Sequence, residues 1–131
     1  MNKVPANCKY SRTHEWARLE NDGSVTIGIT DHAQDALGDI VFIELPEIGK
    51  EVTKAKEFGV IESVKSASDI FAPISGKVIA INSNAVTSPA ILNTDPEGEG
   101  WLIRITINDQ TELDQLMNAK EYETFLAETA H

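Results

Sequence analysis

The chain has 131 residues, of which 21 are acidic and 11 are basic, so its formal net charge at pH 7 is −10. A charge of this sign disfavours nucleic acids and anionic membranes as partners, because both bind basic surfaces, and it favours partners that are themselves basic. The single cysteine, Cys8, excludes an internal disulfide, and without a second cysteine or a closely spaced histidine pair we expect no metal site.

The N-terminal segment MNKVPANCKYSRTHEW lacks the apolar region of a signal peptide and the Arg-rich, Ser-rich character of a transit peptide. No apolar run in the chain approaches the length that crosses a bilayer. With its 41% hydrophobic residues the chain is long enough to bury one core. We therefore expect a soluble cytoplasmic protein that forms a single domain over residues 1–131.

The first elements predicted along the chain are a β-hairpin and a short helix. Apolar residues alternate with small or polar ones over residues 25–29, directly after the turn sequence ENDGS, which is typical of a half-buried strand. Residues 16–20 are its expected partner. In the following stretch TDHAQDALGD, Thr30 or Asp31 can cap a helix of at most two turns, and Gly38 can end it.

Short strands separated by turns fill most of the remaining chain. Turn sequences such as PEIGK, KSAS, APISGK and DPEGEG stand between the apolar runs. This alternation predicts a mainly β protein, a sandwich or a barrel. The strands are expected at residues 41–45, 58–62, 70–71, 78–81 and 101–107.

The C-terminal residues change to a helical period. Apolar side chains recur at helical spacing between residues 113 and 126, Thr111 and Asp114 resemble a capping box, and Asn118 with Glu121 can restart the helix after a bend. Such a stripe is far more often core than cofactor site. We therefore expect this helix to pack on the β-structure rather than to take part in chemistry.

Two similar half-motifs flank Lys65. PEIGKEV leads into FGVIES, and APISGKV leads into IAIN, so each places a proline and a glycine turn before a β-branched run. Their positions suggest two similar halves that meet near a hairpin carrying Lys65.

Lys65 lies in the sequence SVKSAS, between two expected strands. A Schiff-base or general-base lysine needs an apolar pocket or a second cation to lose its proton, and this setting supplies neither. Small neighbours in a turn instead leave an exposed amine that another enzyme can acylate. An unmodified surface lysine is the alternative, and the local sequence alone favours that alternative.

Five blocks of sequence resemble the glycine cleavage system H proteins: THEW, VTIGITDHAQDALGDIVFIELPEIG, GVIESVKSASDIFAPISGKV, LNTDPEGEGWLIRI and ELDQLMNAKEYETFL. They occur in the order of the family and cover nearly the whole chain. The resemblance implies a barrel-sandwich hybrid, similar to lipoyl domains, with a short helix in the N-terminal half and a C-terminal helix. It also implies that lipoate is attached to Lys65 by an amide bond and that the protein is a carrier, not an enzyme.

The resemblance further implies the partners of such a carrier. Lipoyl-Lys65 would take an aminomethyl group from the pyridoxal-phosphate glycine decarboxylase (P protein) and present it to the folate-dependent aminomethyltransferase (T protein). Dihydrolipoyl dehydrogenase (L protein) would then reoxidise it, and a lipoate-attaching enzyme would modify it beforehand. We expect the carrier to be a monomer.

The resemblance assigns roles to four further residues. Glu62 is expected to help the lipoylating enzyme recognise the site. Thr13, Glu15 and Asp69 are expected to shelter the loaded arm from water, although an ordinary solvated or turn-forming acid is the alternative for Glu15 and Asp69. His14 and His32 are weaker candidates for such contacts, and we interpret them as packing or capping histidines.

Two other functions compete with this one. A biotinyl carrier uses the same kind of hairpin lysine, but its turn usually reads Met-Lys-Met, whereas Val64 and Ser66 flank Lys65. A binding module, or a relay that donates lipoyl groups to other complexes, is the other alternative. The sequence shows no nucleophile with a base, no phosphate loop and no metal cluster that would indicate an enzyme.

Overall fold

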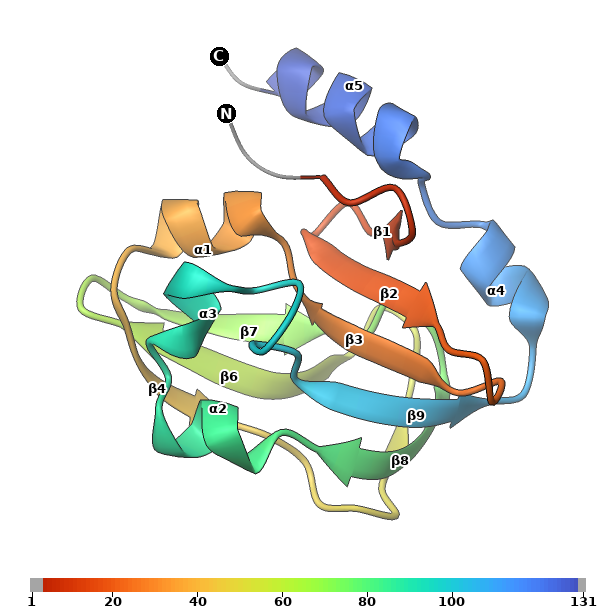
Figure 1. Ribbon diagram of the computed structural model, residues 1–131, viewed down its shortest axis with the longest axis horizontal. Helices are drawn as coiled ribbons and strands as arrows, with labels where there is room; N and C mark the ends of the chain where they lie inside the picture. Colours follow the sequence, from red (N-terminus) through yellow and green to blue (C-terminus); the bar gives the residue numbers. More distant parts are fainter. Residues whose placement is uncertain (1–3, 130–131) are drawn as a thin grey trace.

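Two antiparallel β-sheets form the body of the protein, in a computed structural model that describes residues 4–129. A six-stranded sheet has the order β1, β2, β3, β9, β8, β5, and a three-stranded sheet has the order β4, β6, β7. Helices lie around the sheets, with α5 beside β1 and α1 above the β6–β7 hairpin (Figure 1). The elements are β1 (Lys9–Tyr10), β2 (Glu15–Leu19), β3 (Val25–Ile29), α1 (Asp31–Leu37), β4 (Ile40–Glu44), β5 (Glu51–Val52), β6 (Glu57–Ser63), β7 (Ala67–Phe71), β8 (Gly76–Ile81), α2 (Ser83–Thr87), α3 (Ile91–Thr94), β9 (Ile103–Ile107), α4 (Gln110–Asp114) and α5 (Ala119–Thr129).

The main core lies between the sheets and consists mostly of β-branched side chains from the strands. A second cluster joins the N-terminal segment to α5 through four buried residues, Cys8, Tyr10, Trp16 and Tyr122. Burial within this cluster raises the pKa of the Cys8 thiol to about 11, so the thiol stays protonated at neutral pH.

The prediction that β3 is half-buried is wrong, because all five of its residues are buried. On the face that should meet solvent, the Thr26 hydroxyl donates to the Glu20 carboxylate and accepts a hydrogen bond from Arg104. Gly28 lies against the indole of Trp16, where a Cβ atom would come within 2.6 Å of the ring. The small and polar residues of β3 therefore make room for neighbouring side chains rather than facing water.

The two half-motifs that flank Lys65 pair with each other. β5 runs antiparallel to β8, with Glu51 opposite Lys77 and Val52 opposite Gly76. A Cβ atom at Gly76 would lie 2.0 Å from the carbonyl oxygen of Thr106, so the close strand contact requires glycine at this position. The two segments therefore meet, as predicted, but they do so in the six-stranded sheet, whereas Lys65 lies in the β6–β7 turn of the three-stranded sheet.

The helices follow the sequence signals in part. Thr30 caps α1 by accepting a hydrogen bond from the Ala33 amide, as one of the two predicted caps, and α1 ends before Gly38. The predicted capping box of Thr111 and Asp114 is wrong. The carboxylate of Asp109 accepts both the amide and the hydroxyl of Thr111, so Asp109 caps α4 and Thr111 lies inside the helix.

The start of α5 is confirmed, because Asn118 and Glu121 exchange hydrogen bonds between each side chain and the other residue's amide, both 2.8 Å long. The sequence did not predict the two short helices α2 and α3, or strands β1 and β5, which have two residues each.

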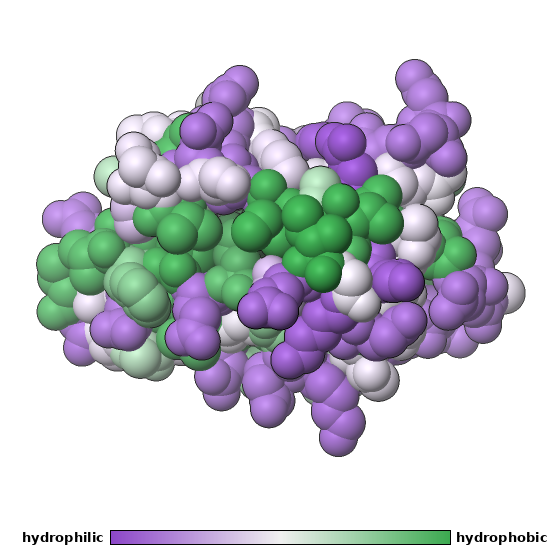
Figure 2. Space-filling view, turned by 90° about the horizontal axis from the view of Figure 1, so that it is seen from below, coloured by the Kyte–Doolittle hydropathy of each residue, from purple (hydrophilic) through white to green (hydrophobic). Residues whose placement is uncertain are grey.

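Hydrophobic side chains form a band across the face of the molecule that lies at the bottom of Figure 1 (Figure 2). Several large hydrophobic side chains of the described residues are exposed. They are Leu19, Val41, Phe42, Ile48, Val64, Ile79 and Val86. Three of these, Val41, Phe42 and Val64, come from β4 and the β6–β7 turn, so apolar surface lies close in the fold to Lys65.

Candidate functional site

Lys65 lies in the turn of the β6–β7 hairpin, which projects beneath α1 (Figure 1). The turn is fixed by Ser63, whose hydroxyl oxygen accepts hydrogen bonds from the amides of Lys65 and Ser66, each 3.2 Å long. The Ser63 amide donates to the Ser66 carbonyl at 2.8 Å. The small residues around Lys65 therefore build a hydrogen-bonded turn, and the lysine side chain is exposed on it.

The Lys65 side chain lies over the C-terminal end of α1. Its Nζ donates to the carbonyl oxygen of Ala36 at 3.1 Å, and its Cε lies 3.1 Å from the position that a Cβ at Gly38 would occupy. The only ion pair among residues 4–129 joins Arg18 to Glu20, so no carboxylate of that range pairs with Lys65. An amine held only by one exposed carbonyl is accessible to a modifying enzyme.

A cavity of about 180 Å³ lies next to this end of α1. It brings together Thr13, Glu15 and Asp69, which come from separate parts of the chain. Glu62 does not line it. The lining residues are Thr13, His14, Glu15, Ile29, Ala33, Ala36, Leu37, Ile61, Ser68, Asp69 and Ile70. Ala36 is thus both a wall of the cavity and the residue that Lys65 contacts, which places the lysine at the edge of the cavity.

Glu15 is the buried acid of this cavity, with 3% of its surface exposed. Its Oε1 accepts hydrogen bonds from the hydroxyls of Ser11 and Thr13, and its Oε2 accepts one from the Phe71 amide at 3.2 Å. Burial raises the pKa of Glu15 to about 7, and the three hydrogen bonds limit that rise because they favour the carboxylate. Asp69, by contrast, is exposed on β7. The cavity therefore has one desolvated acid and one solvated acid.

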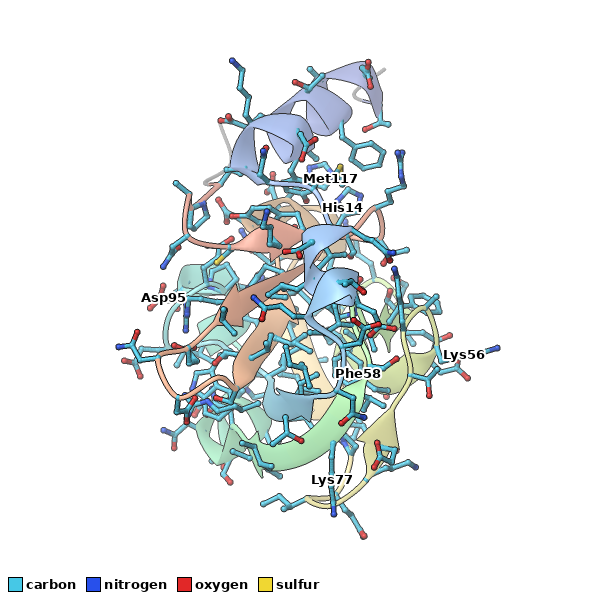
Figure 3. All side chains as sticks on the ribbon, turned by 90° about the vertical axis from the view of Figure 1, so that its right-hand side faces the viewer. His14, Lys56, Phe58, Lys77, Asp95 and Met117 are labelled. Carbon is cyan, nitrogen blue, oxygen red and sulfur yellow. The ribbon has the colours of Figure 1, made fainter. Side chains whose placement is uncertain are left out.

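His14 also lines the cavity, a role that our sequence interpretation missed. Its Nδ1 lies 2.8 Å from the hydroxyl of Tyr122, and its backbone has φ 73°, which is unusual for a residue other than glycine. In Figure 3 the His14 label lies below α5, near Met117. Burial and the neighbouring His32, whose ring centroid is 4.5 Å away, lower the pKa of His14. No local signal could reveal this role, because Tyr122 is 108 residues away in the chain.

Glu62 lies on the solvent side of the hairpin, opposite Phe42 of β4 and Ala67 of β7. Val64, two residues further on, has 67% of its surface exposed. The surface beside Lys65 thus combines an acid with apolar side chains, which is a suitable contact for an enzyme that works on the lysine.

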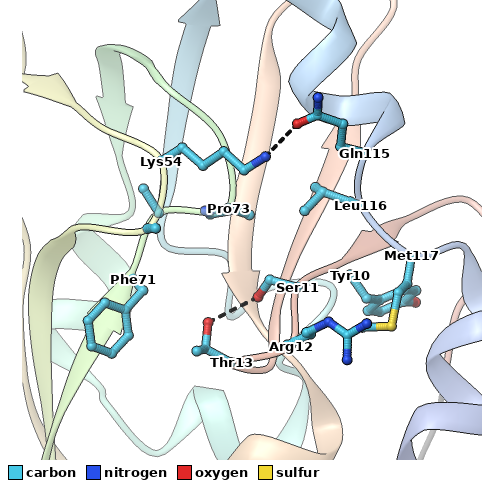
Figure 4. A pocket seen from close by; sticks show the side chains of 12 residues that line it. Tyr10, Ser11, Arg12, Thr13, Lys54, Phe71, Pro73, Gln115, Leu116 and Met117 are labelled. Carbon is cyan, nitrogen blue, oxygen red and sulfur yellow. Dashed lines mark hydrogen bonds between the residues drawn. The ribbon is translucent and has the colours of Figure 1, made fainter.

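A larger cavity, of about 460 Å³, is lined in part by Ser11, Arg12 and Thr13 (Figure 4). It shares Thr13 with the first cavity but contains neither Glu15 nor Asp69. Its polar groups include Lys54, which donates to the Gln115 amide oxygen at 2.6 Å. This cavity therefore presents cationic and neutral groups, and the acids expected to shelter the arm face the smaller one.

Residues 4–129 contain neither a metal-site cluster nor a membrane-spanning helix. No group of three or more His, Cys, Asp or Glu side chains in this range has the arrangement of a metal site. No helix in the same range is long and apolar enough to cross a membrane.

Comparison with known proteins gives consistent matches. A family model described as glycine cleavage H-protein matches residues 8–129. The glycine cleavage system H protein of Alkalilimnicola ehrlichii is 52% identical over 128 residues, which cover 98% of each chain. That of a Psychrobacter species is 52% identical over 126 residues, which cover 96% of this chain and all of the relative.

The crystal structure of a glycine cleavage system H protein from Mycobacterium marinum is similar in fold, with a TM-score of 0.85 and 35% sequence identity. The match covers 98% of this chain and 100% of that protein. The likeness confirms the predicted mainly β, barrel-sandwich fold with a short helix in the N-terminal half and a helix at the C-terminus.

Proposed function

The chain belongs to the glycine cleavage H-protein family and is a lipoyl carrier component rather than a catalyst, and we propose that Lys65 is the residue that carries the lipoate. The exposed position of Lys65 at the edge of a cavity with an acidic wall is the observation that carries this proposal. The lysine lies on a turn fixed by Ser63, so a modifying enzyme would meet an ordered target.

The residues around Lys65 fit an attached lipoyl group. The amide bond would remove the lysine charge, which no carboxylate among the described residues neutralises at present. Apolar walls from Leu37, Ile61 and Ile70 suit the hydrocarbon part of the arm, and Thr13, Glu15 and Asp69 suit a cationic group at its end. Lipoate supplies the dithiolane, on which the redox and group-carrying chemistry takes place.

The proposed cycle follows from the family. The carrier, a monomer of one domain, receives an aminomethyl group from the glycine decarboxylase, delivers it to the aminomethyltransferase and is reoxidised by dihydrolipoyl dehydrogenase. As the relatives are bacterial proteins, we place this exchange in the cytoplasm. Between enzymes, Glu15, Asp69 and Thr13 would hold the cationic end of the arm away from bulk water. Glu62 would contact the lipoate-attaching enzyme.

Replacing Lys65 by arginine tests the attachment site. Because the lysine is exposed and contacts only the Ala36 carbonyl, Lys65→Arg should change the free energy of unfolding by less than about 0.5 kcal/mol. Guanidinium is not an acyl acceptor, so the variant should gain no lipoyl mass and should show no activity in a reconstituted glycine cleavage assay. Intact-mass measurement followed by peptide mapping of both proteins gives the answer.

Each outcome of the mass measurement decides between the candidate functions. A lipoyl increment on Lys65 of the wild type, lost in Lys65→Arg, supports the proposal. A biotin increment would support a biotinyl carrier instead. An unmodified wild-type chain from cells that lipoylate other proteins would overturn the proposal and favour a binding module.

A further inference from the structure

The hydroxyl of Tyr122 joins three elements that meet at the cavity. It lies 2.8 Å from Nδ1 of His14, in the turn before β2, and 2.8 Å from Oγ1 of Thr30, the residue that caps α1. The Thr30 oxygen also accepts the Ala33 amide, at 3.1 Å. Tyr122 belongs to α5 and is fully buried. One hydroxyl of the C-terminal helix thus connects the turn that directly precedes Glu15 to the N-terminus of α1.

The donors and acceptors of this cluster form a single chain. The Thr30 oxygen accepts from the Ala33 amide, and we assign its hydroxyl as the donor to the Tyr122 oxygen, so that the Tyr122 hydroxyl donates to Nδ1 of His14. Burial lowers the pKa of His14 and raises that of Tyr122 to about 12, so both side chains are neutral at pH 7. A neutral His14 that accepts at Nδ1 carries its proton on Nε2.

The two ends of this series of hydrogen bonds, His14 and Thr30, belong to segments that line the cavity. His14 directly precedes Glu15, and Thr30 starts the helix whose residues Ala33, Ala36 and Leu37 line the opposite wall. The left-handed backbone of His14 is unfavourable for a residue with a Cβ atom, so contacts elsewhere must hold it in place. Two backbone hydrogen bonds and the Tyr122 hydroxyl are the contacts that do so.

We propose that Tyr122 is a positioning residue for the loaded lipoyl arm: its hydroxyl holds the His14 turn against the N-terminus of α1 and thereby sets the place of the Glu15 carboxylate in the cavity. This inference rests on the proposed function, since it concerns the same cavity. It also gives α5 a part in the site, whereas the sequence pattern predicted only packing for this helix.

Tyr122→Phe removes the hydroxyl and keeps the ring. Tyr10→Phe is a matched control, because Tyr10 is equally buried in the same cluster and stacks on Tyr122 at 4.6 Å, but its hydroxyl donates to the Pro5 carbonyl, away from the cavity. Each lipoylated protein is loaded with the aminomethyl group. The breakdown of this loaded group is then measured as the formaldehyde that is released. Breakdown should be about fivefold faster in Tyr122→Phe than in the wild type, and within twofold of the wild type in Tyr10→Phe.

A second measurement does not need the arm. Nitrogen-15 NMR of the unlipoylated chain should show His14 protonated at Nε2 in the wild type and in Tyr10→Phe. In Tyr122→Phe the donor to Nδ1 is lost, so the fraction of this tautomer should fall. An unchanged His14 spectrum would overturn the inference, because no hydrogen bond from Tyr122 would then exist to position anything.

The two proposals fail in different ways. If aminomethyl-loaded wild type breaks down as fast as free aminomethyl-dihydrolipoamide, the cavity gives no shelter and that part of the proposed function is wrong. If the wild type is protected and Tyr122→Phe is protected equally, the shelter stands and the positioning role of Tyr122 is wrong. Circular dichroism of both phenylalanine variants checks that their fold is retained.

Discussion

The buried carboxyl group of Glu15 forms no ion pair with any cation of residues 4–129, and this makes the stability of the protein depend on pH. Because the pKa is raised from 4.5 to about 7 on folding, the folded protein binds the proton more tightly than the unfolded chain does. The stability that the protonated acid contributes is complete below pH 4.5 and is lost as the pH rises through about 7. Above that pH the protein holds a desolvated charge.

Replacing Glu15 by glutamine should remove this pH dependence. The glutamine NH2 group can donate to the Ser11 and Thr13 oxygens, whereas the protonated acid donates to one of them, and the glutamine oxygen can accept from the Phe71 amide. Between pH 5 and pH 8 the free energy of unfolding of the wild type should therefore fall by about 2.5 kcal/mol relative to that of Glu15→Gln. Urea denaturation at both values of pH measures the difference.

Asp69→Asn is the control for this effect, since Asp69 lines the same cavity but is exposed. Its unfolding free energy should follow that of the wild type at both values of pH. Parallel pH dependence of the wild type and Glu15→Gln would show that Glu15 is ionised with an ordinary pKa in the folded protein.

The sequence predicted some of the residues that line the cavity and missed others. Thr13, Glu15 and Asp69 were expected together only because the chain resembles the family, and the structure brings them to one cavity. The cavity role of His14 could not be predicted, because it depends on Tyr122, which the fold brings from the far end of the chain. Local sequence identifies polar residues, but it does not reveal hydrogen-bond partners from remote segments.

The start of helix α5 is determined by a local sequence signal. Its first turn is closed by the reciprocal hydrogen bonds of Asn118 and Glu121, and Tyr122 follows at once. Asn118→Ala removes the cap and should lower the free energy of unfolding by about 1 kcal/mol, as measured by urea denaturation.

Thr124→Ala is the matched control for the α5 cap. Thr124 lies in the same helix, and its hydroxyl only donates back to the Lys120 carbonyl, so its removal should leave stability unchanged or slightly higher. Equal losses in the two variants would mean that the cap contributes nothing specific.

The sequence predicted helices and strands correctly where the hydrophobic pattern was long or where capping residues marked an end. The strands around Lys65, helix α1 and the start of α5 were all predicted, since alternation and capping residues identify them. Helices α2 and α3 have only five and four residues, too few for a helical period to appear. Thr111 was misassigned because Asp109, two residues earlier, offers a carboxylate that accepts both of its donors.

The whole molecule carries a net charge of −10, and its carrier role requires repeated encounters with other proteins. Charge of one sign steers a partner of opposite sign from a distance, and salt screens the effect. The exposed acid Glu62 and the apolar side chains of Val64 and Phe42 lie near the lysine. Long-range attraction should thus depend on total charge, and docking should depend on this local surface.

Two variants that change the total charge equally separate these contributions. Glu62→Gln alters the surface beside Lys65, and Glu123→Gln alters an exposed acid on α5. For the lipoate-attaching enzyme we expect kcat/KM at low salt to fall about fivefold in Glu62→Gln and less than twofold in Glu123→Gln. Raising the salt concentration should lower kcat/KM for the wild type, with the loss mainly in KM. Equal effects of the two substitutions would show that only total charge matters, and rates independent of salt would show that neither steering nor an acidic contact at Glu62 contributes.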